Sequence, residues 1–169
     1  MLKRFITAAA LAVALVLPAQ AQIKAGEKSL GPKLGFASHN TSAFAGLVFN
    51  YAFSQHLRIA PQIGCVFRHK DQDALLIDLD IHVPFGIVSN DKAALYPLAG
   101  LAFNSWSRHG VDITSGEDVT SHINRFGGNL GAGFDLRCNQ SLRLNFEAKY
   151  TLVKSYSSLY IGAGISYVF

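Results

Sequence analysis

Apolar and polar residues alternate strictly along residues 141–152, which read SLRLNFEAKYTL. Leu142, Leu144 and Phe146 begin an apolar set at every second position, with Arg, Asn, Glu, Lys and Thr between them. A period of two places the two sets on opposite faces of a β-strand, whereas a helix would scatter them around its circumference. The pattern therefore predicts a strand, and the closing residues 158–169 repeat it with Gly and Ser as the small or polar partners.

Eight segments of the chain carry this alternation. They span residues 29–38, 42–53, 57–68, 74–88, 93–106, 123–136, 141–153 and 158–169. The fifth segment is the least regular, because Tyr96, Leu98 and Trp106 interrupt its alternation. The sequence predicts an all-β fold: an eight-stranded antiparallel up-and-down transmembrane β-barrel, preceded by a cleaved signal peptide.

The start of the chain predicts the compartment. Lys3 and Arg4 precede an apolar run over residues 5–17, and an Ala-Gln-Ala sequence ends at Ala21. This is the pattern of a secretory signal peptide at residues 1–21, and the run is shorter than the roughly 20 residues of a spanning helix. Residues 22–169 are then expected to form a single barrel domain.

Removing the leader changes the charge balance. The 15 basic residues of the chain fall to 13 when Lys3 and Arg4 leave, against 11 acidic residues. The mature chain is nearly neutral and has no clustered Lys/Arg face of the kind that binds nucleic acid, so no nucleic-acid partner is expected.

The links between predicted strands differ at the two ends of the barrel. Links at the end that holds both termini are short and rich in Ser, Asn, Asp and Gln, as tight turns are. The opposite end includes the only long link, at residues 107–122. Short turns on one side and longer loops on the other are typical of bacterial outer-membrane barrels, which predicts periplasmic termini. The first group comprises 54–56, 89–92 and 137–140, and the second comprises 39–41, 69–73, 107–122 and 154–157.

Alternation alone does not decide which face is outside. A membrane barrel turns its apolar face to lipid, whereas a secreted lipocalin-like carrier would turn it inward around a ligand. The membrane alternative is favoured because charged residues share a face with glycines and because aromatic residues gather near strand ends, as in the two interfacial belts of membrane barrels. The expected outer belt is Phe67, Phe103, Trp106 and Tyr156, and the expected inner belt is Phe53, Phe85, Phe134, Tyr167 and Phe169.

The lumen of an eight-stranded barrel is just wide enough for side chains, so the inward polar residues are expected to pack without an open channel. Extrapolation from the turns places Gly162 and Gly164 across from Lys149 and Glu147, and Gly131 and Gly133 near Arg143 and Glu147. A buried carboxylate without a partner would cost several kcal/mol, so paired networks are expected. Further inward candidates are Arg58, Gln62, Asp78, Asp80, His82, Arg125 and Asp135.

Two groups of residues suggest metal or acid/base chemistry. Asp78, Asp80 and His82 share one strand face, which fits a metal or catalytic cluster as well as a structural network; the network is favoured because polar interiors are the norm in this architecture. A second group, near the outer loops, could line a surface metal or haem site, but neither HExxH nor a Cys/His zinc spacing is present. No catalytic, cofactor-binding or metal-binding residue is therefore predicted. The loop group is His39, His69, His109, His122, Asp112, Glu117 and Asp118.

A resemblance to a known family is carried by the leader, by the eight segments and by three stretches of sequence. FGGNLGAGFDLR at 126–137, LRLNFEAKY at 142–150 and the final ISYVF resemble the small eight-stranded outer-membrane barrels of Gram-negative bacteria, of the OmpA and OmpX kind. The resemblance implies that the last strand, with Ile165, Tyr167 and Phe169, is the address read by the barrel-assembly machinery. It also implies residence in the outer membrane among phospholipid and lipopolysaccharide.

An enzymatic alternative comes from barrels that remove acyl chains from lipid A with His, Ser and Glu. Ser121, His122, Asn124 and Glu147 match those types only in part, because the family's serine follows its histidine by two places and that position is Asn124. Alternation also puts Ser121 and His122 on opposite faces, where a nucleophile and its base cannot meet. The chain is therefore expected not to be an enzyme.

The two cysteines are expected to remain free thiols. Cys65 falls midway along a predicted strand and Cys138 in a turn of a distant hairpin. A disulfide needs Cα atoms within about 7 Å of each other.

The expected product is a monomeric barrel with a packed polar interior and a structural, adhesive or envelope-maintaining role. The best place for a surface partner is the loop at residues 107–121, because binding residues concentrate on loops held by a rigid scaffold.

Overall fold

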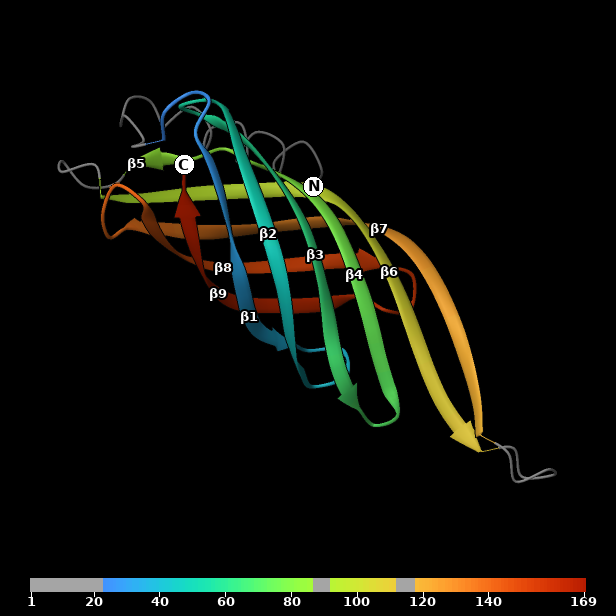
Figure 1. Ribbon diagram of the computed structural model, residues 1–169. Helices are drawn as coiled ribbons and strands as arrows, with labels where there is room; N and C mark the ends of the chain where they lie inside the picture. The colour runs from blue at the N-terminus through green and yellow to red at the C-terminus, as the bar shows by residue number, and fades with distance from the viewer. Residues whose placement is uncertain (1–22, 87–91, 112–117) are drawn as a thin grey trace, which may run out of the picture.

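A computed structural model describes residues 23–86, 92–111 and 118–169, which form nine antiparallel strands in one sheet (Figure 1). Neighbours in the chain are neighbours in the sheet except for β4 and β5, and the sheet closes where β1 pairs with β9 and β4 pairs with β6. The strands are β1 (Lys28–Ala37), β2 (Ser42–Ser54), β3 (Leu57–His69), β4 (Gln72–His82), β5 (Phe85–Gly86), β6 (Ala93–Val111), β7 (Asp118–Arg137), β8 (Leu142–Val153) and β9 (Ser158–Val168). None of these described residues forms a helix that could cross a membrane.

The barrel has eight strand positions, as predicted, because β4 and β5 share one position and both pair with β6. The single strand expected at 74–88 is interrupted at Pro84, which has no backbone N–H to give to the ladder. Val83 still donates to the carbonyl of Pro97 before the interruption. The leader at 1–21 and most of the predicted turn at 89–92 lie outside the described residues.

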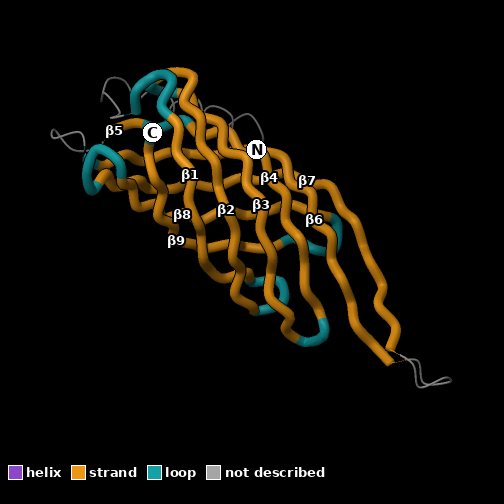
Figure 2. Tube along the Cα trace, in the orientation of Figure 1, coloured by secondary structure: helices purple, strands orange, loops and turns teal. Residues whose placement is uncertain are grey.

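The predicted long loop at 107–122 is wrong. Strands β6 and β7 pair continuously out to Val111 opposite Asp118, so only 112–117 separate them, and that segment lies outside the described residues. Figure 2 shows this β6–β7 hairpin extending well past the other hairpins. The outward positions of this hairpin carry polar residues, Ser107, His109, Thr120 and His122. The apolar alternation used to find strands marks only the part of a strand that lies in lipid.

The two ends of the barrel differ in what they contain. The terminal mouth holds Lys28 and Phe169, whose backbone groups bond each other at 3.3 and 2.9 Å. The hairpin mouth holds the turns at 38–41, 70–71 and 154–157 and the β6–β7 hairpin.

The expected orientation of the sheet is confirmed. Large apolar side chains are exposed on the outer face of the strands, including Leu34, Leu101, Phe146 and Ile165, while the charged residues between them are buried inside. A soluble monomer rarely exposes a contiguous apolar band of this kind, whereas a membrane barrel requires it. The lipocalin-like alternative, which needs the reverse orientation, is excluded by this arrangement.

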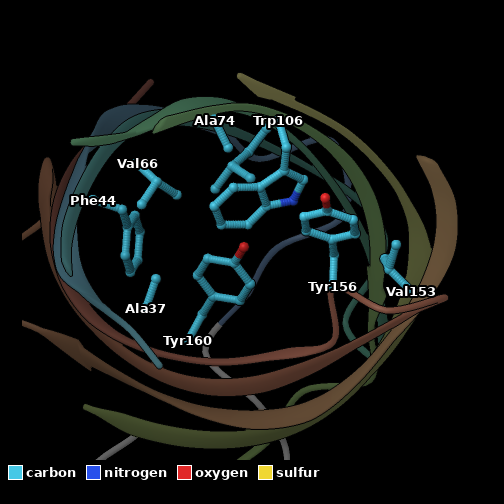
Figure 3. Packing of buried hydrophobic residues seen from close by; sticks show 9 residues of the cluster. Ala37, Phe44, Val66, Ala74, Trp106, Val153, Tyr156 and Tyr160 are labelled. Carbon is cyan, nitrogen blue, oxygen red and sulfur yellow. The ribbon is translucent and has the colours of Figure 1, made fainter. Parts of the chain in front are cut away.

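The lumen is divided into two layers. The layer near the terminal mouth is polar, as expected, but the layer near the hairpin mouth is apolar and aromatic (Figure 3). Trp106 and Tyr156 belong to this inner layer, with exposures of 0% and 4%, so their assignment to the outer aromatic belt is wrong. The cluster comprises Ala37, Phe44, Val66, Ala74, Leu76, Trp106, Val153, Tyr156 and Tyr160.

The outward apolar face generates the first prediction. Leu130 on β7 is 63% exposed, so its replacement by Arg in a water-soluble protein would change stability by only about 0.5 kcal/mol. If lipid covers this face, Leu130→Arg costs about 2–4 kcal/mol near the bilayer midplane. The measurement is urea unfolding of the protein in lipid vesicles. His122→Arg, on the projecting hairpin, is the control and is expected to be nearly neutral; equal effects of the two substitutions would contradict a lipid-facing band.

Candidate functional site

The polar layer is a set of buried ion pairs joined across the lumen. Lys149 Nζ lies 2.8 Å from Asp78 and 2.9 Å from Asp80. Lys33 Nζ lies 2.7 Å from Glu147 and donates to Gln62. Because each charge faces an opposite charge, the desolvation cost of burying them is offset.

A second group of the same layer is built around Arg58. The guanidinium lies 2.6 Å from the Asp135 carboxylate and donates to Nδ1 of His82. His82 stacks on the Tyr96 ring at 4.5 Å, and the Tyr96 hydroxyl donates to Glu147 at 3.2 Å. The two groups thus form one network.

The side chains of Asp78, Asp80 and His82 share a strand face but bind different partners. Both carboxylates bind Lys149, while the imidazole is held by Arg58. Asp80 also accepts from Asn129. The structural interpretation of this cluster is therefore the one that the geometry supports.

Glycines make room for the network, but in a register that differs in part from the expected one. Gly133 pairs with Glu147, as expected, and Gly131 pairs with Lys149 rather than lying near Arg143. Gly162 pairs with Glu147, and Gly164 pairs with Asn145. The pairings of Gly162 and Gly164 are displaced by two residues from the expected ones because Ser158, the first residue of β9, pairs with Thr151 and not with Val153, the last residue of β8.

At Gly133 the requirement for glycine is steric. A Cβ there would overlap the phenol ring of Tyr96, which crosses the lumen from β6. The inward position of Tyr96 also explains why the fifth segment looked irregular: its large apolar residues Tyr96, Leu98 and Trp106 fill the lumen instead of facing outward.

The terminal mouth is held by a clamp that the sequence did not predict. Glu27 precedes β1, and its carboxylate binds both Arg137 of β7 and Arg143 of β8. Backbone bonds from Gly26 and to Glu27 tie the same segment to Ala52 of β2. Nothing in the local pattern marks Glu27, because its partners are more than 100 residues away.

The hairpin mouth is covered by His39, which lies in the turn between β1 and β2. Its ring contacts Trp106 edge-to-face at 4.8 Å and Tyr156 at 5.1 Å. Arg108 lies over the other side of this group, 5.6 Å from the Tyr156 ring centroid. Burial and, secondarily, the positive charge of Arg108 hold the pKa of His39 below its ordinary value.

The outer face of the β6–β7 hairpin is tied by polar contacts. His109 bonds Asp73 of β4 at 2.6 Å and Thr120 of β7 at 3.2 Å. Ser107 bonds His122 at 3.1 Å two register pairs closer to the barrel. These cross-strand contacts hold the root of the hairpin against β4.

The expected loop histidines do not gather into a metal site. His109 and His122 lie within strands, His39 covers the lumen, and Asp112 and Glu117 lie outside the described residues. Within 23–86, 92–111 and 118–169, no three His, Cys, Asp or Glu side chains are placed to hold a metal ion.

The residues of the lipid deacylase alternative do not meet. Ser121 pairs with Arg108 and His122 with Ser107, on opposite faces of β7. Glu147 is in the lumen, bonded to Lys33 and Tyr96.

Both cysteines are free thiols, as expected from their positions in the predicted strands and turns. Cys65 lies exposed on the outer face of β3, and Cys138 lies exposed just after β7.

The β6–β7 hairpin leaves a long strand edge open. β7 begins at Asp118, but its pairing with β8 begins only at Gly127 opposite Val153. Residues 118–126 are therefore paired with β6 on one side and with no described strand on the other.

The register identifies which backbone groups face the open side. Arg137 N–H donates toward β6, to Lys92, and Cys138 N–H donates toward β8, to Leu142. Backbone groups of successive strand residues point to alternate sides, and the β6–β7 register runs without a shift. Thr120, His122, Asn124 and Phe126 therefore turn both N–H and C=O toward the open side, where the Asn124 carbonyl accepts from Nη1 of Arg125 at 3.0 Å. All four residues are exposed.

A closed sheet with a charged lumen and an apolar outer face defines a transmembrane β-barrel. The chain matches the family described as "Outer membrane protein beta-barrel domain" over residues 7–169, and it belongs to that family. This confirms the resemblance found in the sequence and places the protein among outer-membrane barrels of Gram-negative bacteria.

Several solved structures share the fold. A major outer membrane protein of Thermus thermophilus aligns with a TM-score of 0.69 and 12% identity, over 85% of this chain and 99% of that one. The N-terminal barrel domain of Pseudomonas aeruginosa OprF gives 0.66 and 14%, over 87% and 100%. Ail, the attachment invasion locus protein of Yersinia pestis, gives 0.61 and 14%, over 86% and 99%. A search of curated proteins gives no match.

The lumen network generates the second prediction. Lys149→Met leaves Asp78 and Asp80 buried without their cation, which is expected to lower the free energy of unfolding by about 3–5 kcal/mol. Denaturant unfolding in vesicles measures the loss. Adding Asp78→Asn and Asp80→Asn should recover much of it, while Lys154→Met, in an exposed turn, should cost about 0.5 kcal/mol or less. If Lys149→Met lowered the free energy of unfolding no more than Lys154→Met, the stabilising role of the network would be contradicted.

The third prediction concerns pH. Because the pKa of His39 is lowered in the folded protein, its neutral form is favoured there. The stability it contributes is present above the ordinary histidine pKa of about 6.5 and is lost as the pH falls below it. Trp106 emission, which reports exposure of the layer beneath His39, is expected to shift to the red on acidification. The shift should be reduced in His39→Gln; identical titrations of the two proteins would contradict it.

Proposed function

We propose that this protein is a monomeric, non-enzymatic outer-membrane barrel that binds a partner outside the cell through its β6–β7 hairpin. One observation carries the proposal: the hairpin presents an open β7 edge, residues 118–126, on a rigid two-stranded support. A row of unpaired amides and carbonyls is a template for pairing with another chain, and proteins usually cover or blunt such edges.

The support is stiffened at its root, which favours binding over free motion. His109 and Asp73 join the hairpin to β4, and the ring of Trp106 anchors its inner face in the aromatic layer. A preorganised edge loses less conformational entropy when a partner strand adds to it.

The proposed orientation places the terminal mouth in the periplasm and the hairpin outside. It rests on the predicted leader and on the short turns at residues 55–56 and 138–141, opposite the long hairpin. In this orientation the final strand, with Tyr167 and Phe169 exposed side by side, is available to the assembly machinery during insertion. Phospholipid and lipopolysaccharide would surround the apolar band.

Two further features support a non-enzymatic role. The charged groups of the lumen are paired with each other, and the residues of the deacylase alternative do not meet, because His122 lies on the outer face of β7 whereas Ser121 and Glu147 lie on the inner face. Ail, one of the proteins with this fold, carries attachment in its name. The adhesive role is proposed for this chain by analogy with that name.

The fourth prediction separates backbone from side chain at the open edge. Thr120→Pro and Asn124→Pro remove N–H groups that point away from β6, so the hairpin ladder remains intact. Thr120→Ala and Asn124→Ala change the same side chains and keep the amides. Cells that produce the proline variant are expected to adhere to cultured epithelial cells about tenfold less than cells with the alanine variant.

Heat-modifiable gel migration of each variant checks that the barrel is folded. Equal adhesion by proline and alanine variants would contradict binding at the β7 edge. Adhesion that does not differ between the wild type and a strain lacking the gene would contradict the adhesive role itself.

A further inference from the structure

The inner face of the hairpin root carries hydrogen-bond donors without acceptors. Asn104 on β6 and Arg125 on β7 are direct cross-strand partners on this face. Nδ2 of Asn104 and Nε of Arg125 are both buried and have no hydrogen-bond partner, and Nε1 of Trp106, two register pairs farther out, has none either. Directly paired side chains have Cβ atoms roughly 5 Å apart, so the first two donors belong to neighbouring side chains on this face.

Buried donors of this kind are rarely left unpaired, because each forfeits the hydrogen bonds it made to water. Indole and guanidinium nitrogens donate and do not accept, so the missing group is an acceptor. The guanidinium of Arg125 also carries a positive charge, which favours a negatively charged acceptor. The ligand chemistry that these donors fit is an oxyanion.

Other residues near Arg125 are also positively charged. Arg108 lies on the same inner face, over Tyr156, and Lys154 is exposed in the turn that ends just beside the open edge. The described positions of this face, 104–110 on β6 and 119–125 on β7, contain no inward carboxylate. Asp73, the nearest acid on the neighbouring strand, is bound by His109 on the outer face.

A strand that adds to β7 would bring its own side chains to this site. Residues of an added strand that stand opposite Ile123 or Arg125 point to the inner face, because directly paired residues share a face of the sheet. The half-buried Arg125 lies next to the open edge, since the β8 ladder stops at Val153.

We propose that the strand bound at the β7 edge carries an acidic side chain on its inner face, and that Arg125 and Asn104 receive its carboxylate. This inference rests on the proposed function, since it assigns the chemistry of the partner that the open edge takes. The backbone groups of the edge bind an added strand whatever its sequence. Arg125 makes binding tighter when that strand carries an acidic side chain on its inner face.

The test uses purified full-length protein in lipid nanodiscs and two synthetic decapeptides of alternating Thr and Val. One peptide has a central Glu and the other a central Gln at the same position. The Glu peptide is expected to bind about tenfold more tightly, as measured by fluorescence titration, because a charge-assisted hydrogen bond is stronger than a neutral one. Hydrogen exchange at the amides of Thr120, His122 and Asn124 reports whether the peptide occupies the edge.

Arg125→Gln is expected to remove the preference for Glu while the Gln peptide binds as before. Arg68→Gln is the matched control, because Arg68 lies exposed at the end of β3, beside Asp73, and should leave the preference intact. N-acetylglutamate alone should not protect the three amides.

The outcomes separate the two proposals. Equal binding of both peptides to the wild type, unchanged in Arg125→Gln, overturns the selection for acid and leaves strand addition standing. Strand addition is overturned if neither peptide binds, or if the peptides bind equally to Thr120→Pro and Thr120→Ala. This inference then fails with it.

Discussion

Closure of the sheet by backbone hydrogen bonds is the constraint on which the other features depend. In lipid a strand edge without partners would leave amides and carbonyls unsatisfied, so β1 must meet β9 and β4 must meet β6. Once the cylinder is closed, alternation sends every second side chain to the interior. The chain must then fill a narrow space with whatever those positions encode, and it does so with ion pairs in one layer and aromatic rings in the other.

The same constraint is relaxed where the chain leaves the membrane. Past Phe103 and Phe126, a pair of aromatic residues on the outer face, the outer-face side chains of the hairpin become polar and β7 continues without a partner on one side. Water can satisfy an unpaired edge there, and so can another chain. The proposed binding role therefore follows from the boundary between lipid and water.

The fold could be predicted from sequence because lipid imposes a period of two on the outward positions of every strand. Leu142 to Leu152 and their partners in β9 needed no knowledge of tertiary structure. The hairpin at 107–121 could not be found this way, because its outward residues face no lipid and its alternation is lost. Glu27 and the partners of Arg58 depend on which strands meet across the lumen, which local patterns do not encode. Trp106 and Tyr156 were misplaced because aromatic residues near a strand end suit both an interfacial belt and an interior.

The aromatic layer has a consequence for the passage of ions. Phe44, Trp106 and Tyr160 fill the cross-section of the lumen, and each is at most 3% exposed. These rings interrupt the charged layer, so the described lumen offers an ion no continuous path of charged groups from one mouth to the other.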